Sequence, residues 1–261
     1  MTNYNRNHFL FVILCLFNAV ITLAQKPDPD GTRQADKPCE PAKDYAIIKK
    51  GETKCLTEQT MLTYLTLEGG TLIISGNARI NNLAINKGQI IITNTASAIL
   101  PSMIFNGNVS LINRGSVTYT GNVTMINGNN QIVNETPESK MNWGNSELNL
   151  GGRQSSFVNN GSVVLGTLRL DSKSGKTVLG PNAALHVVNL VNNYSNSIFV
   201  PNGIATLTQS GYAQLSKPLT SHPGLRICLG SNAKLPVPTG TSTGYGSATM
   251  LDKTCNETSK H

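Results

Sequence analysis

Short runs of apolar and β-branched residues, separated by Gly and Asn, dominate the chain between Cys55 and Ser216. Within the runs, apolar and polar residues alternate, as in 117–120 (Val-Thr-Tyr-Thr) and 162–165 (Ser-Val-Val-Leu). A period of two places alternate side chains on opposite faces of a strand, and no run has the sustained 3.6-residue apolar period of an amphipathic helix. The pattern therefore predicts an all-β protein built from many short strands.

One motif recurs along these runs: an apolar residue, Asn or Glu, any residue, Gly, a small polar residue, then apolar, any and apolar. Its four copies are centred on Gly70, Gly88, Gly115 and Gly161. The wide gap before the last copy suggests a degenerate copy near 143–148, and a weaker copy follows at 190–200. We expect the four glycines to be structural corners, because Gly and Asn accept a positive φ at least cost.

Short strands joined by corners at a period of about 20 residues indicate a parallel β-helix, or β-solenoid, with irregular rungs. Stacked rungs bury a continuous apolar column that one rung alone could not bury. Like residues on successive rungs can also form amide ladders, which would account for the abundant asparagine. A β-sandwich is the structural alternative, since it also has closely spaced strands. The repeated corner favours the solenoid.

The N-terminal segment has the pattern of a secretory signal peptide. Residues 9–24 are apolar, end near a small-x-small cleavage pattern and are short for a membrane span, which needs about 20 apolar residues. Cys15 raises a lipoprotein alternative, but Leu14 stands where a lipobox has a small residue. We predict a signal peptide over 1–24, a Pro-rich flexible leader over 25–38, and a secreted protein that is extracellular or on the cell surface.

Export would leave four cysteines in an oxidising compartment: Cys39, Cys55, Cys228 and Cys255. Four cysteines allow three pairings, and pairing of sequence neighbours would close both ends of the rod. A zinc site is the alternative, but the chain has no C-x-x-C. The expected organisation is an N-terminal cap and first strand over 39–68, the solenoid over 69–220, and a loop-rich C-terminal cap over 221–261.

The formal net charge of +7 could suggest a nucleic-acid partner. However, much of the lysine lies near the chain ends, and no aromatic residues are interleaved with basic ones between them. We therefore predict no nucleic-acid partner and a weak attraction to anionic polysaccharide or a cell surface. The oligomeric state is left open.

Few residues could perform catalysis. Glycoside hydrolysis normally needs two carboxylates at the scissile bond, and a pair of Glu147 and Asp171 on stacked rungs is the conceivable one. A polysaccharide lyase or hydrolase on a β-helix scaffold is therefore the alternative function. We expect no catalytic residue, metal or cofactor. Tyr119 and Trp143 could stack on sugar rings as weak ligand contacts, or could instead fill a corner or loop.

The chain resembles secreted β-solenoid repeat proteins of Bacteroidetes-type bacteria, which are often parts of larger surface adhesins. The resemblance covers about residues 50–256, and the motifs that carry it are 68–77 (Glu-Gly-Gly-Thr-Leu-Ile-Ile-Ser-Gly-Asn), the Asn-x-Gly-Ser-Val copies, 227–230 (Ile-Cys-Leu-Gly), 246–249 (Gly-Ser-Ala-Thr) and Cys255. It implies a surface or matrix role without catalytic residues. The predicted function is a structural or adhesive surface module that binds carbohydrate or cell-envelope components through its outward faces.

Overall fold

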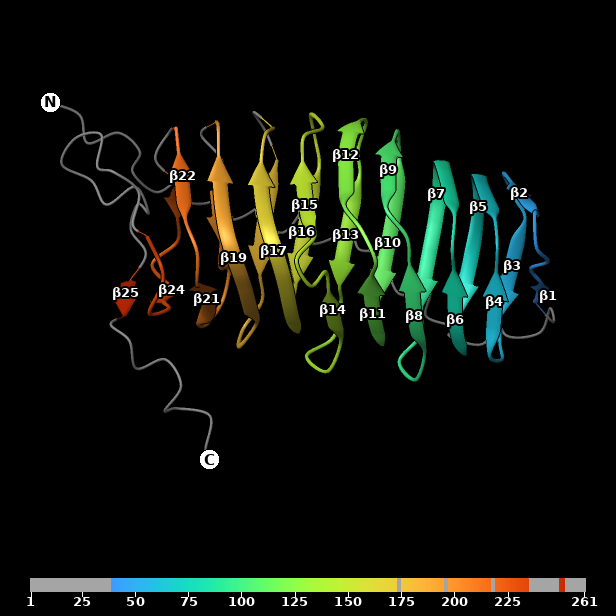
Figure 1. Cartoon of the computed structure of the whole chain (residues 1–261), viewed down its shortest axis with the longest axis horizontal. Coiled ribbons are helices and arrows are strands. Elements are labelled where there is room, and N and C mark those ends of the chain that lie inside the picture. Colours follow the sequence, from blue (N-terminus) through green and yellow to red (C-terminus); the bar gives the residue numbers. More distant parts are fainter. Residues whose placement is uncertain (1–38, 173–174, 195–196, 217–218, 235–248, 252–261) are drawn as a thin grey trace, which may run out of the picture. The chain divides into compact units, whose positions relative to one another are not determined.

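The computed structural model describes residues 39–172, 175–194, 197–216, 219–234 and 249–251. These residues form strands joined by turns, and no helix occurs among them. The strands pair in parallel and stack as a β-solenoid of about 8 turns, which confirms the predicted fold class. Figure 1 shows successive turns side by side, from the blue strands near β2 to the red strands near β25.

Each turn contributes three strands, so the stack has three faces. Face 1 contains the first strand of each turn. Its strands are β2 (Ile47–Lys49), the first parts of β5 (Leu65–Ile74) and β7 (Leu83–Ile92), β9 (Met103–Asn106), β12 (Val123–Asn127), β15 (Glu147–Leu150), the last parts of β17 (Ser162–Leu170) and β19 (Ala184–Asn192), and β22 (Ala213–Leu215).

Face 2 contains the second strand of each turn. Its strands are β1 (Glu40–Pro41), β3 (Thr53–Leu56), the last parts of β5 and β7, β10 (Val109–Asn113), β13 (Gln131–Asn134), β16 (Ser156–Asn159), β18 (Lys176–Leu179), β20 (Ser197–Phe199) and β23 (Thr220–Ser221).

Face 3 contains the third strand and completes the turn. Its strands are β4 (Thr60–Leu62), β6 (Asn77–Ile80), β8 (Ser97–Leu100), β11 (Ser116–Tyr119), β14 (Lys140–Asn142), the first parts of β17 and β19, β21 (Ala205–Gln209), β24 (Leu225–Leu229) and β25 (Thr249–Leu251). We call the edges between faces corner 1–2, corner 2–3 and corner 3–1.

The turns vary in length around the predicted period. Leu65 pairs with Leu83, a shift of 18 residues, whereas Val123 pairs with Leu148, a shift of 25 residues. The stack also extends past the expected limits of 69–220, since β2, β3 and β4 form a turn before residue 69 and β24 continues face 3 after residue 220. In the 25-residue turn the extra residues lie at the corners, and its strands still pair with those of the neighbouring turns.

The core consists of columns in which equivalent residues of successive turns stack inside the solenoid. The face 3 column is buried and apolar throughout: Ala78, Ala98, Val117, Met141, Val163, Leu185, Leu207 and Ile227. Burial of such side chains stabilises the fold by about 1.5–3 kcal/mol for each large one. The alternation seen in the sequence therefore separates this core from the outward residues.

Three asparagines form an amide ladder inside corner 2–3. Asn113, Asn134 and Asn159 occupy equivalent positions on β10, β13 and β16, and each is fully buried. The Nδ2 of Asn113 donates to the Oδ1 of Asn134 (2.8 Å), and the Nδ2 of Asn134 donates to the Oδ1 of Asn159 (2.9 Å). The predicted amide ladder is therefore present, and it explains how polar side chains are tolerated in the core.

The ladder also pairs with the backbone of the corners. The amide nitrogens donate to the carbonyl oxygens of Gly115 (3.1 Å), Ser139 (3.0 Å) and Ala184 (3.0 Å). On either side, the same column continues as the buried residues Ile92 and Leu179. The corner thus changes from aliphatic to amide packing and back without a change of register.

Tyr119 and Trp143 lie in the core, which corrects the prediction that they contact a ligand. Their exposed fractions are 3% and 1%, and their rings stack with centroids 4.0 Å apart and an interplanar angle of 15°. Phe157 packs edge-on against the Trp143 ring, with centroids 6.5 Å apart. Neither ring can reach a sugar at the surface, because both fill the interior at the end of face 3.

The four predicted corner glycines do lie at corners, but at two different ones. Gly70 and Gly88 lie at corner 1–2, whereas Gly115 and Gly161 lie at corner 2–3. Strand register aligns Gly88 with Val109, so the four sequence copies are not equivalent positions. The suggested degenerate copy at 143–148 is not equivalent to these glycines either. Ser116 pairs with Lys140, so Ser139 is the residue equivalent to Gly115, whereas 143–148 lies at corner 3–1.

Only Gly88 of the four has the positive φ (124°) that was expected. The other three are required by close approach of backbone. A Cβ would lie 2.5 Å from Lys49 O at Gly70, 2.4 Å from Ala96 O at Gly115, and 2.2 Å from Ser139 O at Gly161. The corners therefore select glycine mainly because the chain of the preceding turn passes against them.

The N-terminal end is closed by a short strand held by the predicted disulfide. Cys39 is bonded to Cys55, with their Cα atoms 5.8 Å apart, so β1 is held against β3. Pro41 lies in β1 and has no N–H to donate, which makes this a poor edge for further pairing. Cys228 is also disulfide-bonded, and its expected partner Cys255 lies outside the described residues. The signal peptide, the leader and most of 235–261 also lie outside them.

Candidate functional site

The carboxylates proposed for catalysis belong to an ion-pair network on face 1. Arg169 Nε lies 3.1 Å from Glu147 Oε2 and 3.8 Å from Asp171 Oδ2, so one guanidinium lies between the two acids. Asn149 and Asn193 donate to the Asp171 oxygens at 3.3 Å and 2.6 Å. The acids are brought together as the sequence suggested, but both lie beside the same guanidinium, and Asp171 also accepts hydrogen bonds from two amide groups.

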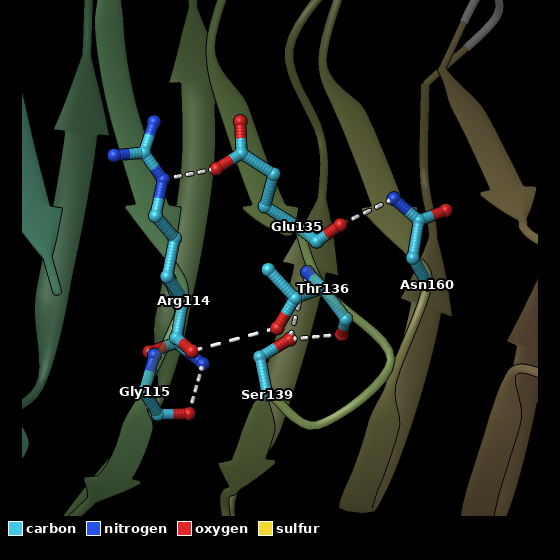
Figure 2. A network of polar contacts seen from close by, with 7 residues as sticks. Arg114, Gly115, Glu135, Thr136, Ser139 and Asn160 are labelled. Carbon is cyan, nitrogen blue, oxygen red and sulfur yellow. Dashed lines mark hydrogen bonds and ion pairs between the residues drawn. The ribbon is translucent and has the colours of Figure 1, made fainter. Parts of the chain in front are cut away.

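A second polar network follows corner 2–3 on the outside of the stack, and Figure 2 shows its side chains on successive turns. Arg114 pairs with Glu135, and Asn160 Nδ2 donates to the backbone oxygen of Glu135 (2.9 Å). Ser139 Oγ donates to Thr136 O (2.6 Å) and closes the short loop beside them. The contacts of Glu135 with Arg114 and Asn160 join neighbouring turns.

The described part of the chain offers no group of three or more His, Cys, Asp or Glu side chains placed to bind a metal ion. Over the same residues, no helix is long and apolar enough to span a membrane.

Among the described residues, the best candidate site is a depression of about 450 Å³ at corner 3–1, in the N-terminal half of the stack. Eight residues line it, and none carries a charge: Tyr64, Asn81, Asn82, Leu83, Ala84, Pro101, Ser102 and Thr120. The tyrosine, the two asparagines, the serine and the threonine are all exposed. The depression thus combines an aromatic ring with several uncharged hydrogen-bonding groups and falls in the size range of small-molecule sites.

Neighbouring contacts fix the orientation of the two asparagines. Asn82 Nδ2 donates to the backbone oxygen of Thr63 (3.0 Å), and Asn81 Oδ1 accepts a hydrogen bond from Arg79 Nε (3.1 Å). Side chains held before a ligand arrives lose less conformational entropy when it binds. The polar part of the depression is therefore partly preorganised.

Tyr64 stacks against Tyr45, and the two form an exposed aromatic pair. Their ring centroids are 6.3 Å apart with an interplanar angle of 19°, and their exposed fractions are 39% and 68%. Tyr45 adopts a φ of 60°, which is uncommon for a non-glycine residue and needs support from its surroundings. Its N–H donates to the backbone oxygen of Tyr64 (2.8 Å), so the two tyrosines are also joined by their backbones.

Asp44 positions this pair. Its Oδ1 accepts hydrogen bonds from the backbone N–H groups of Thr63 (2.7 Å), Tyr64 (2.9 Å) and Tyr45 (3.2 Å). These donors, with that of Tyr64 foremost, lower the pKa of Asp44 below its usual value of 3.8. One carboxylate oxygen therefore anchors both tyrosine backbones to the first turn.

We expect the stabilising effect of Asp44 to depend on pH. A carboxyl group whose pKa is lowered by folding stabilises the fold above its unfolded pKa, and the effect is lost as the pH falls through the lower folded pKa. The Asp44→Asn variant should therefore have a lower free energy of unfolding than the wild type at neutral pH, and the difference should vanish in acid below both pKa values. Urea unfolding across this pH range measures the difference. The exposed Glu58→Gln variant is the control, and an equal pH-dependent difference there would contradict the role of Asp44.

Sequence reasoning did not identify Tyr45 or Tyr64. A signal for Tyr64 was present, because Thr63 and Tyr64 are two consecutive non-core residues between the buried residues Leu62 and Leu65. Such a break in the alternation marks a corner, where side chains face solvent. Conversely, Tyr119 lies two residues after Val117 and therefore on the same, buried side of β11.

Comparison of the chain with protein-family models, with curated proteins and with solved structures gives no match. The resemblance to Bacteroidetes-type repeat proteins therefore stays a prediction.

Proposed function

We propose that the protein is a secreted, non-catalytic surface module that adheres to neutral carbohydrate through the depression beside Tyr64. The observation that carries this proposal is the exposed Tyr45–Tyr64 pair bordering a depression lined by Asn, Ser and Thr side chains. A sugar presents an apolar ring face and a rim of hydroxyl groups. An aromatic ring can pack against the former, while amide and hydroxyl groups exchange hydrogen bonds with the latter.

The charges near the site favour a neutral ligand over an anionic one. No lining residue is charged, and Arg79, which contacts the lining residue Asn81, donates a hydrogen bond to its Oδ1. Much of the lysine lies near the ends of the chain. We therefore place anionic polymers second, as partners held by long-range attraction that salt would screen.

Export is part of the proposal. The disulfide between Cys39 and Cys55 is of the kind that persists in oxidising compartments, and the apolar N-terminal segment fits a secretory leader. A rigid stack of parallel turns joined by corner networks is suited to present a binding site away from a cell surface. These features support an adhesive or structural role rather than a soluble intracellular one.

Tyr64→Ala should abolish most of the carbohydrate binding. We expect a loss in affinity of at least about tenfold, which corresponds to about 1.4 kcal/mol, because the substitution removes the ring face and its partner contact with Tyr45. The measurement is titration calorimetry with soluble xylan, mannan and β-glucan. Met61→Ala is the control, because Met61 is 71% exposed on the neighbouring strand β4 but does not line the depression.

Two results would contradict the proposal. If wild-type protein bound none of these polymers, the depression would not be a carbohydrate site. If it shortened one of them, and Asp171→Asn abolished that activity, the rival function of a polysaccharide-active enzyme would be correct. Chromatography of the polymer before and after incubation detects the second outcome.

A further inference from the structure

The Tyr64 depression is one end of a longer row of side chains along corner 3–1. In each turn, one residue at this corner directly precedes the first inward-facing residue on face 1. Tyr64 occupies this position in the turn of β5, and Tyr212 occupies it in the turn of β22. The positions between them hold side chains that can form hydrogen bonds: Asn82, Ser102, Asn122, Glu147, Thr167 and Asn189. We call all of these residues the corner row.

Strand register places the row in a single line. The residues that follow the row pair with one another from turn to turn, as in Leu65 with Leu83 and Leu190 with Ala213. Within the row, Glu147, Thr167 and Asn189 are themselves paired neighbours. On face 1, no strand pairing joins β7 to β9 among the described residues, but Asn82 and Ser102, which precede the face 1 residues of these two strands, line the same depression. The row is therefore continuous along the stack.

The corner row is accessible to solvent along its length. Tyr64, Asn82, Ser102, Asn122 and Tyr212 are exposed, and the other three members are partly exposed. Tyr212 is 43% exposed, similar to Tyr64 at 39%. Both ends of the row thus present an aromatic ring, with only polar side chains between them.

Contacts within the row hold several of its side chains in place. Asn122 Oδ1 accepts a hydrogen bond from the N–H of Glu147 (2.8 Å). Asn189 Nδ2 donates to Thr167 Oγ1 (3.4 Å), and Asn189 Oδ1 accepts a hydrogen bond from the N–H of Tyr212 (3.2 Å). The one charged member, Glu147, is paired with Arg169. The row therefore presents a preorganised and nearly uncharged line of donors and acceptors.

We propose that the corner row binds one linear, neutral polysaccharide chain that lies along the stack from Tyr64 to Tyr212. This inference rests on the proposed function and extends it from a single sugar subsite to a polymer track. The seven steps from Tyr64 to Tyr212, at about 4.8 Å each, span about 34 Å. An extended sugar polymer advances by a similar distance per unit, so successive sugars meet successive turns. The ligand class is thus an extended chain rather than a branched cluster or a terminal sugar.

The test is the dependence of affinity on chain length. Titration calorimetry uses xylo-, manno- and cello-oligosaccharide ladders from the disaccharide to the octasaccharide, with wild-type protein, Tyr64→Ala and Tyr212→Ala. We expect wild-type affinity to rise with each added sugar until the chain reaches Tyr212. Tyr212→Ala should leave disaccharide affinity unchanged and lower octasaccharide affinity by about fivefold, whereas Tyr64→Ala should weaken every length. Ile204→Ala, at another corner and 43% exposed, is the control and should change neither.

The outcomes separate this inference from the proposed function. If affinity stops rising at the trisaccharide, or if Tyr212→Ala binds the octasaccharide as the wild type does, the track is wrong, while a Tyr64-dependent disaccharide affinity still supports the single site. If no oligosaccharide or polymer binds to the wild type, the proposed function fails with it. Far-UV circular dichroism verifies that each variant retains its β structure.

Discussion

Replacement of Asn134 by aspartate is expected to lower the free energy of unfolding by about 3–5 kcal/mol. Asn134 is the middle member of the buried ladder, where its Nδ2 donates to Asn159 Oδ1 and to Ser139 O. A carboxylate has no N–H at this position, so it would face two acceptors in a site with no exposed surface. The cost is that of an uncompensated charge in the core.

The chain offers a matched control for this substitution. Asn127 Nδ2 donates to Asn106 Oδ1 (2.9 Å) in a similar contact between turns, but both residues are exposed. Asn127→Asp should therefore cost less than about 1 kcal/mol, because water solvates the new charge. Asn134→Leu should be better tolerated than Asn134→Asp, since Ile92 and Leu179 continue the same column. Urea unfolding measures all three, and equal losses for Asn134→Asp and Asn127→Asp would contradict the ladder.

Trp143→Ala is expected to destabilise the protein by about 3–5 kcal/mol through loss of a buried aromatic side chain and the cavity that it leaves. Trp143 is 1% exposed and packs between the stacked ring of Tyr119 and the edge of Phe157. Because loss of the only tryptophan removes its fluorescence, thermal unfolding is followed by circular dichroism. A decrease in the free energy of unfolding below about 1 kcal/mol would contradict the core position of Trp143 and would mean that its side chain lies at the surface.

Tyr119→Phe serves as the companion variant. Tyr119 Oη has no hydrogen-bond partner among the described residues, and burial raises the pKa of this phenol. Removal of the hydroxyl keeps the ring stack and relieves the cost of an unpaired polar group, so stability should be unchanged or about 1 kcal/mol higher. A large loss would mean that the hydroxyl forms a contact that the structure does not describe.

The sequence was sufficient to predict the solenoid because three local signals agreed. The two-residue alternation of apolar residues predicted strands, the recurrent Gly and Asn predicted corners, and the asparagine excess predicted a ladder. The motif alone does not show which positions are equivalent, because Gly88 and Gly115 share it although they lie at different corners. A three-sided turn has several corners with similar steric demands, and similar short motifs can therefore arise at any of them.

The candidate site was harder to predict for a physical reason. Whether an aromatic residue is core or surface depends on its phase relative to the strand, and on where the strand ends. Tyr119 is in phase with the buried Val117 and points inward, whereas Tyr64 follows the end of β4 and points outward. The depression itself joins residues from several successive corners, and only the register of the stacked turns brings them together.

We expect the Tyr64 depression to bind a glycan chain without cleaving it. The most direct test is a crystal structure of the protein with the longest oligosaccharide that it binds. We predict a sugar ring against the face of Tyr64, hydroxyl groups hydrogen-bonded to Asn82 or Ser102, and a chain of its original length. A glycan bound on face 2, or a shortened chain beside Glu147 and Asp171, would contradict this expectation.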